Sequence, residues 1–175
     1  MTHNVFAAIQ VNLQHSADKT LLSIPGGRNL TGSDLDAESA ILSSALIDLG
    51  LEPGDRVSVQ IDKGWMNVVL YLAVLRCGAV YLPLNSAYTN SEIEYFLTDA
   101  ESKLHVCVAD RLSHIESLKG SISGLQVLTL DGETGTLVDT FETAKATGQS
   151  FTDLAARASD DLASIIYTSG TTGKP

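Results

Sequence analysis

Short runs of apolar and β-branched residues alternate with helix-period segments over most of the chain, from residue 33 onward. The predicted strands are residues 57–61, 79–82, 104–108, 125–130 and 162–167. The predicted helices are residues 33–49, 64–76, 89–97, 111–119 and 136–145. This alternation predicts an α/β fold with a mostly parallel sheet, because right-handed crossovers place helices on both faces of such a sheet.

The residues before this alternation predict a helix and a hairpin. Apolar residues recur at helical spacing over residues 3–16, which favours an amphipathic helix there. Residues 21–24 then predict a short strand, residues 25–28 a turn, and residues 29–31 the returning strand.

Capping residues indicate where several elements begin and end. Ser33 is the expected N-cap of the helix that follows it, and Thr89 with Glu92 fits a capping box. Gly78 follows the last apolar residue of a predicted helix, where glycine can end a helix in a left-handed conformation. Residues 146–159 are polar and predict a connector before the last strand.

The composition describes a chain that can form a packed core but carries a strong negative charge. Hydrophobic residues make up 44% of the 175 positions, which is enough for one domain or for part of a larger one. The formal net charge of −10 argues against binding to a nucleic-acid backbone or to an anionic membrane surface. The longest apolar stretch, residues 68–75, is far shorter than the ~20 residues that span a bilayer.

The two cysteines predict neither a disulfide framework nor a metal site. Cys77 and Cys107 lie thirty positions apart, with no CxxC pair and no clustered histidines. We interpret them as buried free thiols, which favours a cytoplasmic location. The first 14 residues lack the basic start and the long apolar run of a signal peptide.

No other titratable residue forms a recognisable catalytic pattern. The four histidines are scattered: His3, His15, His105 and His114. Asp160 and Asp161 are interpreted as a solvated flank of the last strand rather than as a general-base pair. Trp65 is expected to pack in the core, with a place in an interface as the alternative.

The last nine residues carry the chemistry that the sequence predicts. An apolar run passes into a loop of glycines and hydroxyl side chains with one lysine, and its candidate ATP-binding residues are Thr168, Ser169, Gly170, Thr171, Thr172, Gly173 and Lys174. Glycines allow the backbone N–H groups to approach a phosphate closely, while hydroxyls and the lysine supply further donors. In open α/β sheets, ligands bind beyond the carboxyl ends of the strands, which is where this loop is expected.

Two other interpretations of the loop are weaker. A Walker A loop would need glycine at the position of Thr168 and serine or threonine at the position of Pro175, so we reject it. A flexible linker of glycine, serine and threonine remains open, although the strand predicted just before the loop disfavours it.

Residues 167–175, YTSGTTGKP, resemble the phosphate-loop signature TSGTTGxPKG of the adenylate-forming acyl-CoA synthetase superfamily. Residues 54–57 resemble the "PGDRV" turn of that superfamily, and residues 72–85 resemble its "AxLRAGAVxxPLN" helix and strand. Within the superfamily, residues 70–95 are most similar to the malonyl-CoA synthetases.

This resemblance implies that the chain is the N-terminal portion of an adenylation domain, residues 1–175, ending in the phosphate loop 167–175. It implies ATP, Mg²⁺ and coenzyme A as cofactors and co-substrates, and a small carboxylic acid, preferably malonate, as substrate. Another short-chain acid or an amino acid is the alternative within the superfamily. The later segments that bind adenine, ribose and Mg²⁺, and the C-terminal domain with its adenylation lysine, would lie outside these residues.

No catalytic residue and no metal ligand are therefore predicted within this chain. We expect the chain alone to be inactive, and we expect it to self-associate or to be poorly stable in solution. A non-catalytic binding or oligomerising module is the alternative from a different functional class.

Overall fold

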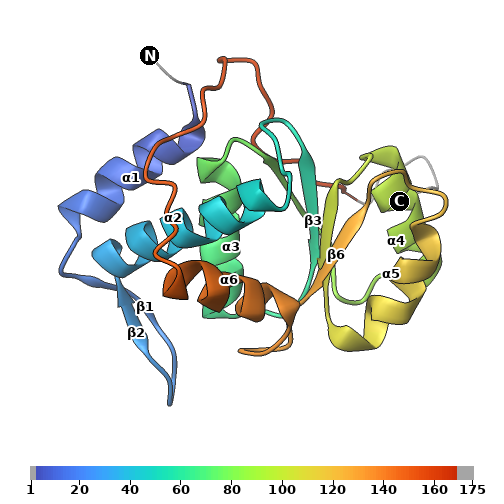
Figure 1. Ribbon diagram of the computed structural model, residues 1–175, viewed down its shortest axis with the longest axis horizontal. Helices are drawn as coiled ribbons and strands as arrows, with labels where there is room; N and C mark the ends of the chain where they lie inside the picture. The colour runs from blue at the N-terminus through green and yellow to red at the C-terminus, as the bar shows by residue number, and fades with distance from the viewer. Residues whose placement is uncertain (1–2, 169–175) are drawn as a thin grey trace.

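The computed structural model describes residues 3–168 and shows a sheet between two layers of helices (Figure 1). In chain order the elements are α1 (Val5–His15), β1 (Thr20–Ser23), β2 (Asn29–Thr31), α2 (Gly32–Asp48), β3 (Arg56–Gln60), α3 (Trp65–Arg76), β4 (Val80–Pro83), α4 (Asn90–Asp99), β5 (Leu104–Cys107), the 3₁₀ helix η1 (Ala109–Arg111), α5 (Leu112–Leu118), β6 (Gln126–Thr129) and α6 (Thr136–Ala146). The predicted α/β class is confirmed.

The sheet has the strand order β4-β3-β5-β6, and all three pairings are parallel. Val57 at its centre lies opposite Tyr81 of β4 on one side and opposite Leu104 of β5 on the other. The chain moves outward from β3 to β4 and then returns past β3 to β5. The strand order therefore reverses beside β3, which is the point where open α/β sheets bind ligands. Strands β1 and β2 form the predicted hairpin apart from this sheet.

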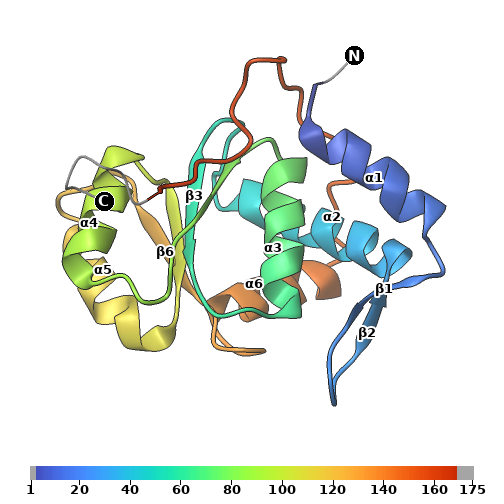
Figure 2. The ribbon, with the colours of Figure 1, turned by 180° about the vertical axis from the view of Figure 1, so that it is seen from behind.

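One face of the sheet is covered by the larger helical layer, which consists of α2, α3 and α6, with α1 packed on α2 and α3 at its outer side (Figure 2). Val57 and Val59 face this layer because successive side chains of a strand alternate between the two faces. Trp65 at the start of α3 is 8% exposed, and its ring meets the ring of Phe141 edge to face. The expectation that Trp65 belongs to the core is confirmed.

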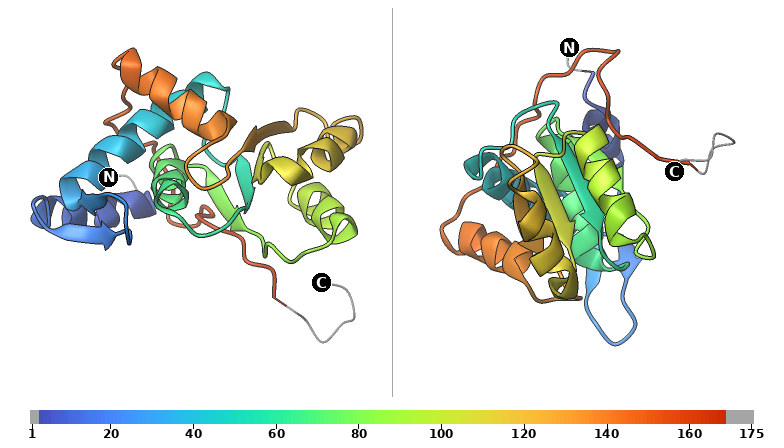
Figure 3. Two further views of the ribbon diagram at one scale, coloured as in Figure 1. Left: turned by 90° about the horizontal axis from the view of Figure 1, so that it is seen from below. Right: turned by 90° about the vertical axis from the view of Figure 1, so that its right-hand side faces the viewer.

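The other face of the sheet packs against α4 and α5 (Figure 3). Leu82 and Cys107 of the sheet contact a core that contains Phe96, Leu97 and Ile115 from the two helices. The two cores lie on opposite sides of one sheet, so helices cover both faces as predicted.

The capping residues agree with the sequence at two helices and differ at one. Thr89 and Glu92 form the predicted capping box of α4, and Gly78 follows α3 with a φ of +76°. The prediction that Ser33 caps α2 is wrong, because α2 begins at Gly32 and its N-cap is Thr31. The Thr31 hydroxyl accepts a hydrogen bond from the Asp34 backbone N–H at 3.1 Å, and the Asp34 carboxylate accepts one from the Thr31 N–H at 2.8 Å.

The prediction of a full last strand over residues 162–167 is also wrong. This segment makes one isolated parallel bridge, between Ser164 and Tyr81 of β4. Leu162 is 58% exposed and Ile166 is 69% exposed. In this register the next ladder bond would come from the backbone N–H of residue 83, but β4 ends there at Pro83, which has none. Ala163, Ile165 and Tyr167 pack against the two cores, while Leu162 and Ile166 remain exposed.

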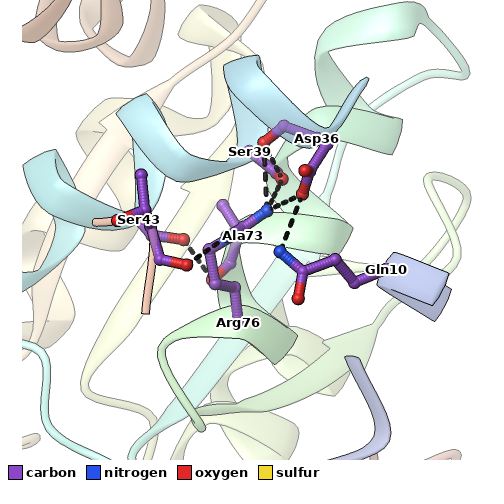
Figure 4. A network of polar contacts seen from close by, with 7 residues as sticks. Gln10, Asp36, Ser39, Ser43, Ala73 and Arg76 are labelled. Carbon is purple, nitrogen blue, oxygen red and sulfur yellow. Dashed lines mark hydrogen bonds and ion pairs between the residues drawn. The ribbon is translucent and has the colours of Figure 1, made fainter. Parts of the chain in front are cut away.

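A buried arginine of α3, which the sequence analysis did not single out, links this helix to α2 and to the connector after α6 (Figure 4). The Arg76 side chain is 1% exposed and makes an ion pair with Asp36 of α2. Its guanidinium also donates to the Ser39 hydroxyl at 3.2 Å and to the Thr152 carbonyl at 3.2 Å. Because these groups come from separate parts of the chain, Arg76 holds the larger helical layer together.

The remaining expectations about single residues agree with the structure. Cys77 and Cys107 are free and buried. Asp160 and Asp161 are exposed, and Asp161 pairs with Arg157 within the connector. No helix within residues 3–168 is long and apolar enough to cross a membrane.

Candidate functional site

The segment that leads into the predicted phosphate loop runs parallel to β4. The Tyr81 N–H donates to the Ala163 carbonyl at 3.0 Å, and the Ile165 N–H donates to the Tyr81 carbonyl at 3.1 Å. A parallel neighbour travels toward the same edge of the sheet as β4. Since Ser164 lies opposite Tyr81, the chain passes the end of β4 within the next few residues and reaches Thr168 at the carboxyl edge.

Tyr167 holds the end of this segment against α4. Its ring centre lies 4.5 Å from that of Phe96 and 6.4 Å from that of Tyr95. Its hydroxyl donates to the Asp99 carboxylate at 2.5 Å. Burial of the ring, together with this hydrogen bond and the Asp99 charge, raises the pKa of Tyr167, so the phenol stays protonated and remains a donor at neutral pH.

The loop after β4 lies along the same edge and is held by side chains from β3 and η1. The Gln60 amide donates to the carbonyls of Asn85 and Tyr88, at 3.0 and 3.3 Å. The Arg111 guanidinium donates to the carbonyls of Tyr88 and Ser86, at 2.9 and 3.3 Å. These bonds fix the backbone of the loop, so the carboxyl edge has a well-defined surface beside the end of the C-terminal segment.

Of the seven predicted site residues, Thr168 is described by the structure and is exposed at this edge. The other six lie outside the described residues: Ser169, Gly170, Thr171, Thr172, Gly173 and Lys174. Their arrangement therefore stays a prediction.

No group of three or more His, Cys, Asp or Glu side chains that could hold a metal gathers within residues 3–168. His105 is fully buried in β5, and its Nδ1 lies 2.8 Å from the Ser58 hydroxyl. Burial lowers the pKa of His105 to about 4, so its imidazole is neutral and enclosed. Burial likewise raises the pKa of Cys77 to about 11, which makes it an unreactive thiol.

Sequence reasoning missed Asp99, Gln60 and Arg111. Only Asp99 offered a signal, because a carboxylate in the last turn of a helix is unfavourable next to the helix dipole and needs another explanation. Gln60 and Arg111 act on backbone carbonyls of a distant loop, and a single sequence does not indicate such contacts.

The chain matches known protein families and curated relatives over most of its length. Residues 9–175 match the family described as AMP-binding enzyme. An oxalate–CoA ligase from Arabidopsis thaliana is 34% identical over 161 residues, which is 90% of this chain and 31% of that protein. Tyrocidine synthase 1 from Brevibacillus parabrevis is 35% identical over 148 residues, which is 85% of this chain and 12% of that protein.

Solved structures agree with these matches. Apo MatB from Rhodopseudomonas palustris is 38% identical with a TM-score of 0.84, and the match covers 98% of this chain and 33% of MatB. The ATP-bound form of MatB gives 37% identity and a TM-score of 0.83 over 99% of this chain. The chain thus spans about a third or less of the length of these relatives. By the match over residues 9–175 and by this fold, the chain belongs to the AMP-binding enzyme family, the adenylate-forming acid ligases.

Proposed function

We propose that the full-length protein is an AMP-forming acid–CoA ligase. It activates a small carboxylic acid with ATP and transfers the acyl group to coenzyme A. Malonate is the preferred acid, because residues 70–95 resemble the malonyl-CoA synthetases. The products are then malonyl-CoA, AMP and pyrophosphate.

The proposed reaction has two steps. A carboxylate oxygen of the acid attacks the α-phosphorus of ATP in line, and the bond from that phosphorus to the bridging oxygen breaks to release pyrophosphate. The thiolate of coenzyme A then attacks the acyl carbon, and AMP leaves with the oxygen that joined them. Residues 168–174 hold the β- and γ-phosphates during the first step, where negative charge builds on the leaving pyrophosphate and nearby donors stabilise it.

The parallel register of the C-terminal segment is the observation that carries this proposal. Because Ser164 pairs with Tyr81 in the parallel sense, the signature residues begin at the carboxyl edge of the sheet. The exposed Thr168 leads the signature there. An ATP-bound relative of the same fold supports ATP as the nucleotide.

The described residues support ATP binding through the exposed Thr168 at this carboxyl edge. Mg²⁺, which the resemblance implies, would neutralise phosphate charge when bound, but residues 3–168 supply no cluster of ligands for it. We assign no step to the metal for this reason. The cytoplasmic location stays part of the proposal and rests on the two free, buried thiols.

The test is ATP–pyrophosphate exchange by the purified full-length protein. We expect exchange with malonate that exceeds exchange with acetate, oxalate, benzoate or any of the amino acids, and AMP formation that requires coenzyme A. Stronger exchange with another short acid would correct the substrate. Exchange with an amino acid and no thioester product would favour the amino-acid adenylation alternative, and no exchange with any acid would refute the proposal.

A further inference from the structure

The backbone alone holds the C-terminal segment weakly. It makes two hydrogen bonds to β4, both through Tyr81, and within the described residues the backbone from Ile166 to Thr168 makes none. Two isolated bonds at a sheet edge do not define where a chain points three residues later. The position of Thr168 must therefore depend on side-chain contacts.

Those contacts are made by the tyrosine anchor, which we define as Tyr167 with Phe96 and Asp99. Phe96 is fully buried on α4, and the capping box of Thr89 and Glu92 holds the first turn of that helix. The ring of Tyr167 packs on Phe96 while its hydroxyl reaches Asp99 at the last position of α4. The Tyr167 side chain is therefore fixed at two points of α4, by its ring on Phe96 and by its hydroxyl on Asp99.

The placement of Asp99 supports a dedicated role. A negative charge in the last turn of a helix is destabilised by the helix dipole, and within residues 3–168 Asp99 has no cationic partner. Its one hydrogen bond in the described part of the chain is the one from Tyr167. The charged acceptor strengthens that bond relative to one between neutral groups.

We propose that Tyr167 and Asp99 are positioning residues, which set where the phosphate loop leaves the sheet and thereby tune ATP binding. The proposal rests on the proposed function, since it assigns phosphate binding to residues 168–174. Neither residue touches the phosphates. They act through the backbone of Thr168, whose amide and hydroxyl begin the donor array.

The test uses the full-length enzyme, four single variants and the double variant Tyr167→Phe with Asp99→Ala. Tyr167→Phe removes the hydroxyl and keeps the ring, Asp99→Ala removes the acceptor, and Asp99→Asn keeps an oxygen acceptor. Tyr71→Phe is the matched control, because Tyr71 is 38% exposed and its hydroxyl makes no hydrogen bond among the described residues. Steady-state kinetics with varied ATP and with varied acid give the two KM values. Hydrogen exchange of the backbone amides of residues 162–168 is measured separately for each variant.

We expect Tyr167→Phe and Asp99→Ala each to raise the KM for ATP by about threefold to tenfold, as the loss of one hydrogen bond does. The KM for the acid should stay within about twofold, and the double variant should be no worse than either single variant, because both remove the same bond. Amides of residues 162–168 should exchange faster in both variants. Tyr71→Phe should resemble the wild type. Asp99→Asn should raise the KM for ATP less than Asp99→Ala does, because it keeps an oxygen acceptor but loses the charge that strengthens the bond.

Two results would overturn the proposal. Unchanged hydrogen exchange in Tyr167→Phe would show that the anchor does not hold the segment. Faster exchange or a lower Tm with an unchanged KM for ATP would show a purely structural role. If the wild type itself shows no ATP-dependent exchange of pyrophosphate with any acid, the proposed function fails first. That outcome differs from one in which the wild type is active and the variants have the wild-type KM for ATP.

Discussion

The guanidinium of Arg76 lies over the ring of Phe6, with 4.3 Å between the guanidinium carbon and the ring centre. This contact joins the end of α3 to the start of α1, two segments separated by the whole of the hairpin and α2. Arg76 also pairs with Asp36, so one buried cation connects α1, α2 and α3. A charge buried this deeply is tolerated because the guanidinium meets a carboxylate, two backbone carbonyls, a hydroxyl and an aromatic face.

Replacing Arg76 by alanine should destabilise the fold strongly. It leaves the Asp36 carboxylate without its partner and opens a void beside Phe6. Breaking a buried ion pair typically costs about 3–5 kcal/mol. Urea unfolding followed by the fluorescence of Trp65, the single tryptophan, measures the change. Lys119→Ala is the control, because its pair with Glu116 is largely exposed and should contribute about 0.5 kcal/mol or less. Equal effects of the two variants would contradict this assignment.

His105 should make the stability depend on pH between about 4 and 6.5. Burial lowers its pKa in the folded state to about 4, whereas an exposed histidine titrates near 6.5. The unfolded chain therefore binds more protons in that window, and stability falls as the pH drops from about 6.5 to about 4. The shift corresponds to about 3 kcal/mol.

The control for this pH dependence is His105→Gln, which cannot titrate in that window. The free energy of unfolding of the wild type should fall more steeply from pH 7 to pH 4.5 than that of His105→Gln. Parallel slopes would mean that other groups carry the acid sensitivity.

Within the phosphate loop, the threonines and glycines should matter more than the lysine. Thr171→Ala removes a hydroxyl donor, and Gly173→Val adds a Cβ where close backbone approach is expected. We expect each to lower kcat/KM for ATP by about tenfold or more in the full-length enzyme, and Lys174→Ala to cost less. Steady-state AMP formation with a thermal melt of each variant provides the comparison. If Lys174→Ala is the most damaging, the register of the signature is wrong.

The 175-residue chain alone should not catalyse adenylation. Catalysis by positioning needs the groups that orient both substrates, and residues 3–168 hold no cluster of metal ligands. The measurement is malonate-dependent ATP–pyrophosphate exchange by the purified chain. A rate above that of a buffer blank would refute the expectation.

The same chain should self-associate through the outer side of its C-terminal segment. Leu162 and Ile166 are exposed beside backbone groups that have no neighbouring strand among the described residues, which is the arrangement that favours strand pairing between copies. Light scattering should show species larger than a monomer, and the double variant Leu162→Ser and Ile166→Ser should reduce them. A monomeric wild type would be evidence against this edge as a contact.

The α/β class could be predicted from the sequence because apolar periodicity is a local signal. The helices from α2 onward repeat apolar residues at helical spacing, residues 57–61 alternate as a strand does, and the other strands are short apolar runs between helical segments. The capping box at Thr89 and Glu92 was equally readable, since both partners lie within four residues. Such predictions depend on neighbours along the chain.

The errors arose where a distant residue decides the outcome. Thr31 and Ser33 each have an aspartate three residues later, so the sequence offers two possible capping boxes for α2. Asp36 pairs with Arg76, which leaves Asp34 to complete the box at Thr31. The segment 162–167 has the composition of a strand, but its partner β4 ends at Pro83, which has no backbone N–H to continue the ladder. The Tyr167 contact with Asp99 joins residues 68 positions apart, which no local pattern indicates.

Phe96 contacts Tyr88 and Tyr167, with ring centres 4.9 and 4.5 Å away, so one residue of α4 supports two segments at the carboxyl edge. This arrangement defines the unit that protein engineers can exchange between relatives. A graft of residues 167–175 alone would place the signature of another protein beside an α4 helix whose side chains do not match its tyrosine. A graft that carries residues 88–99 with the signature moves the loop and its support together.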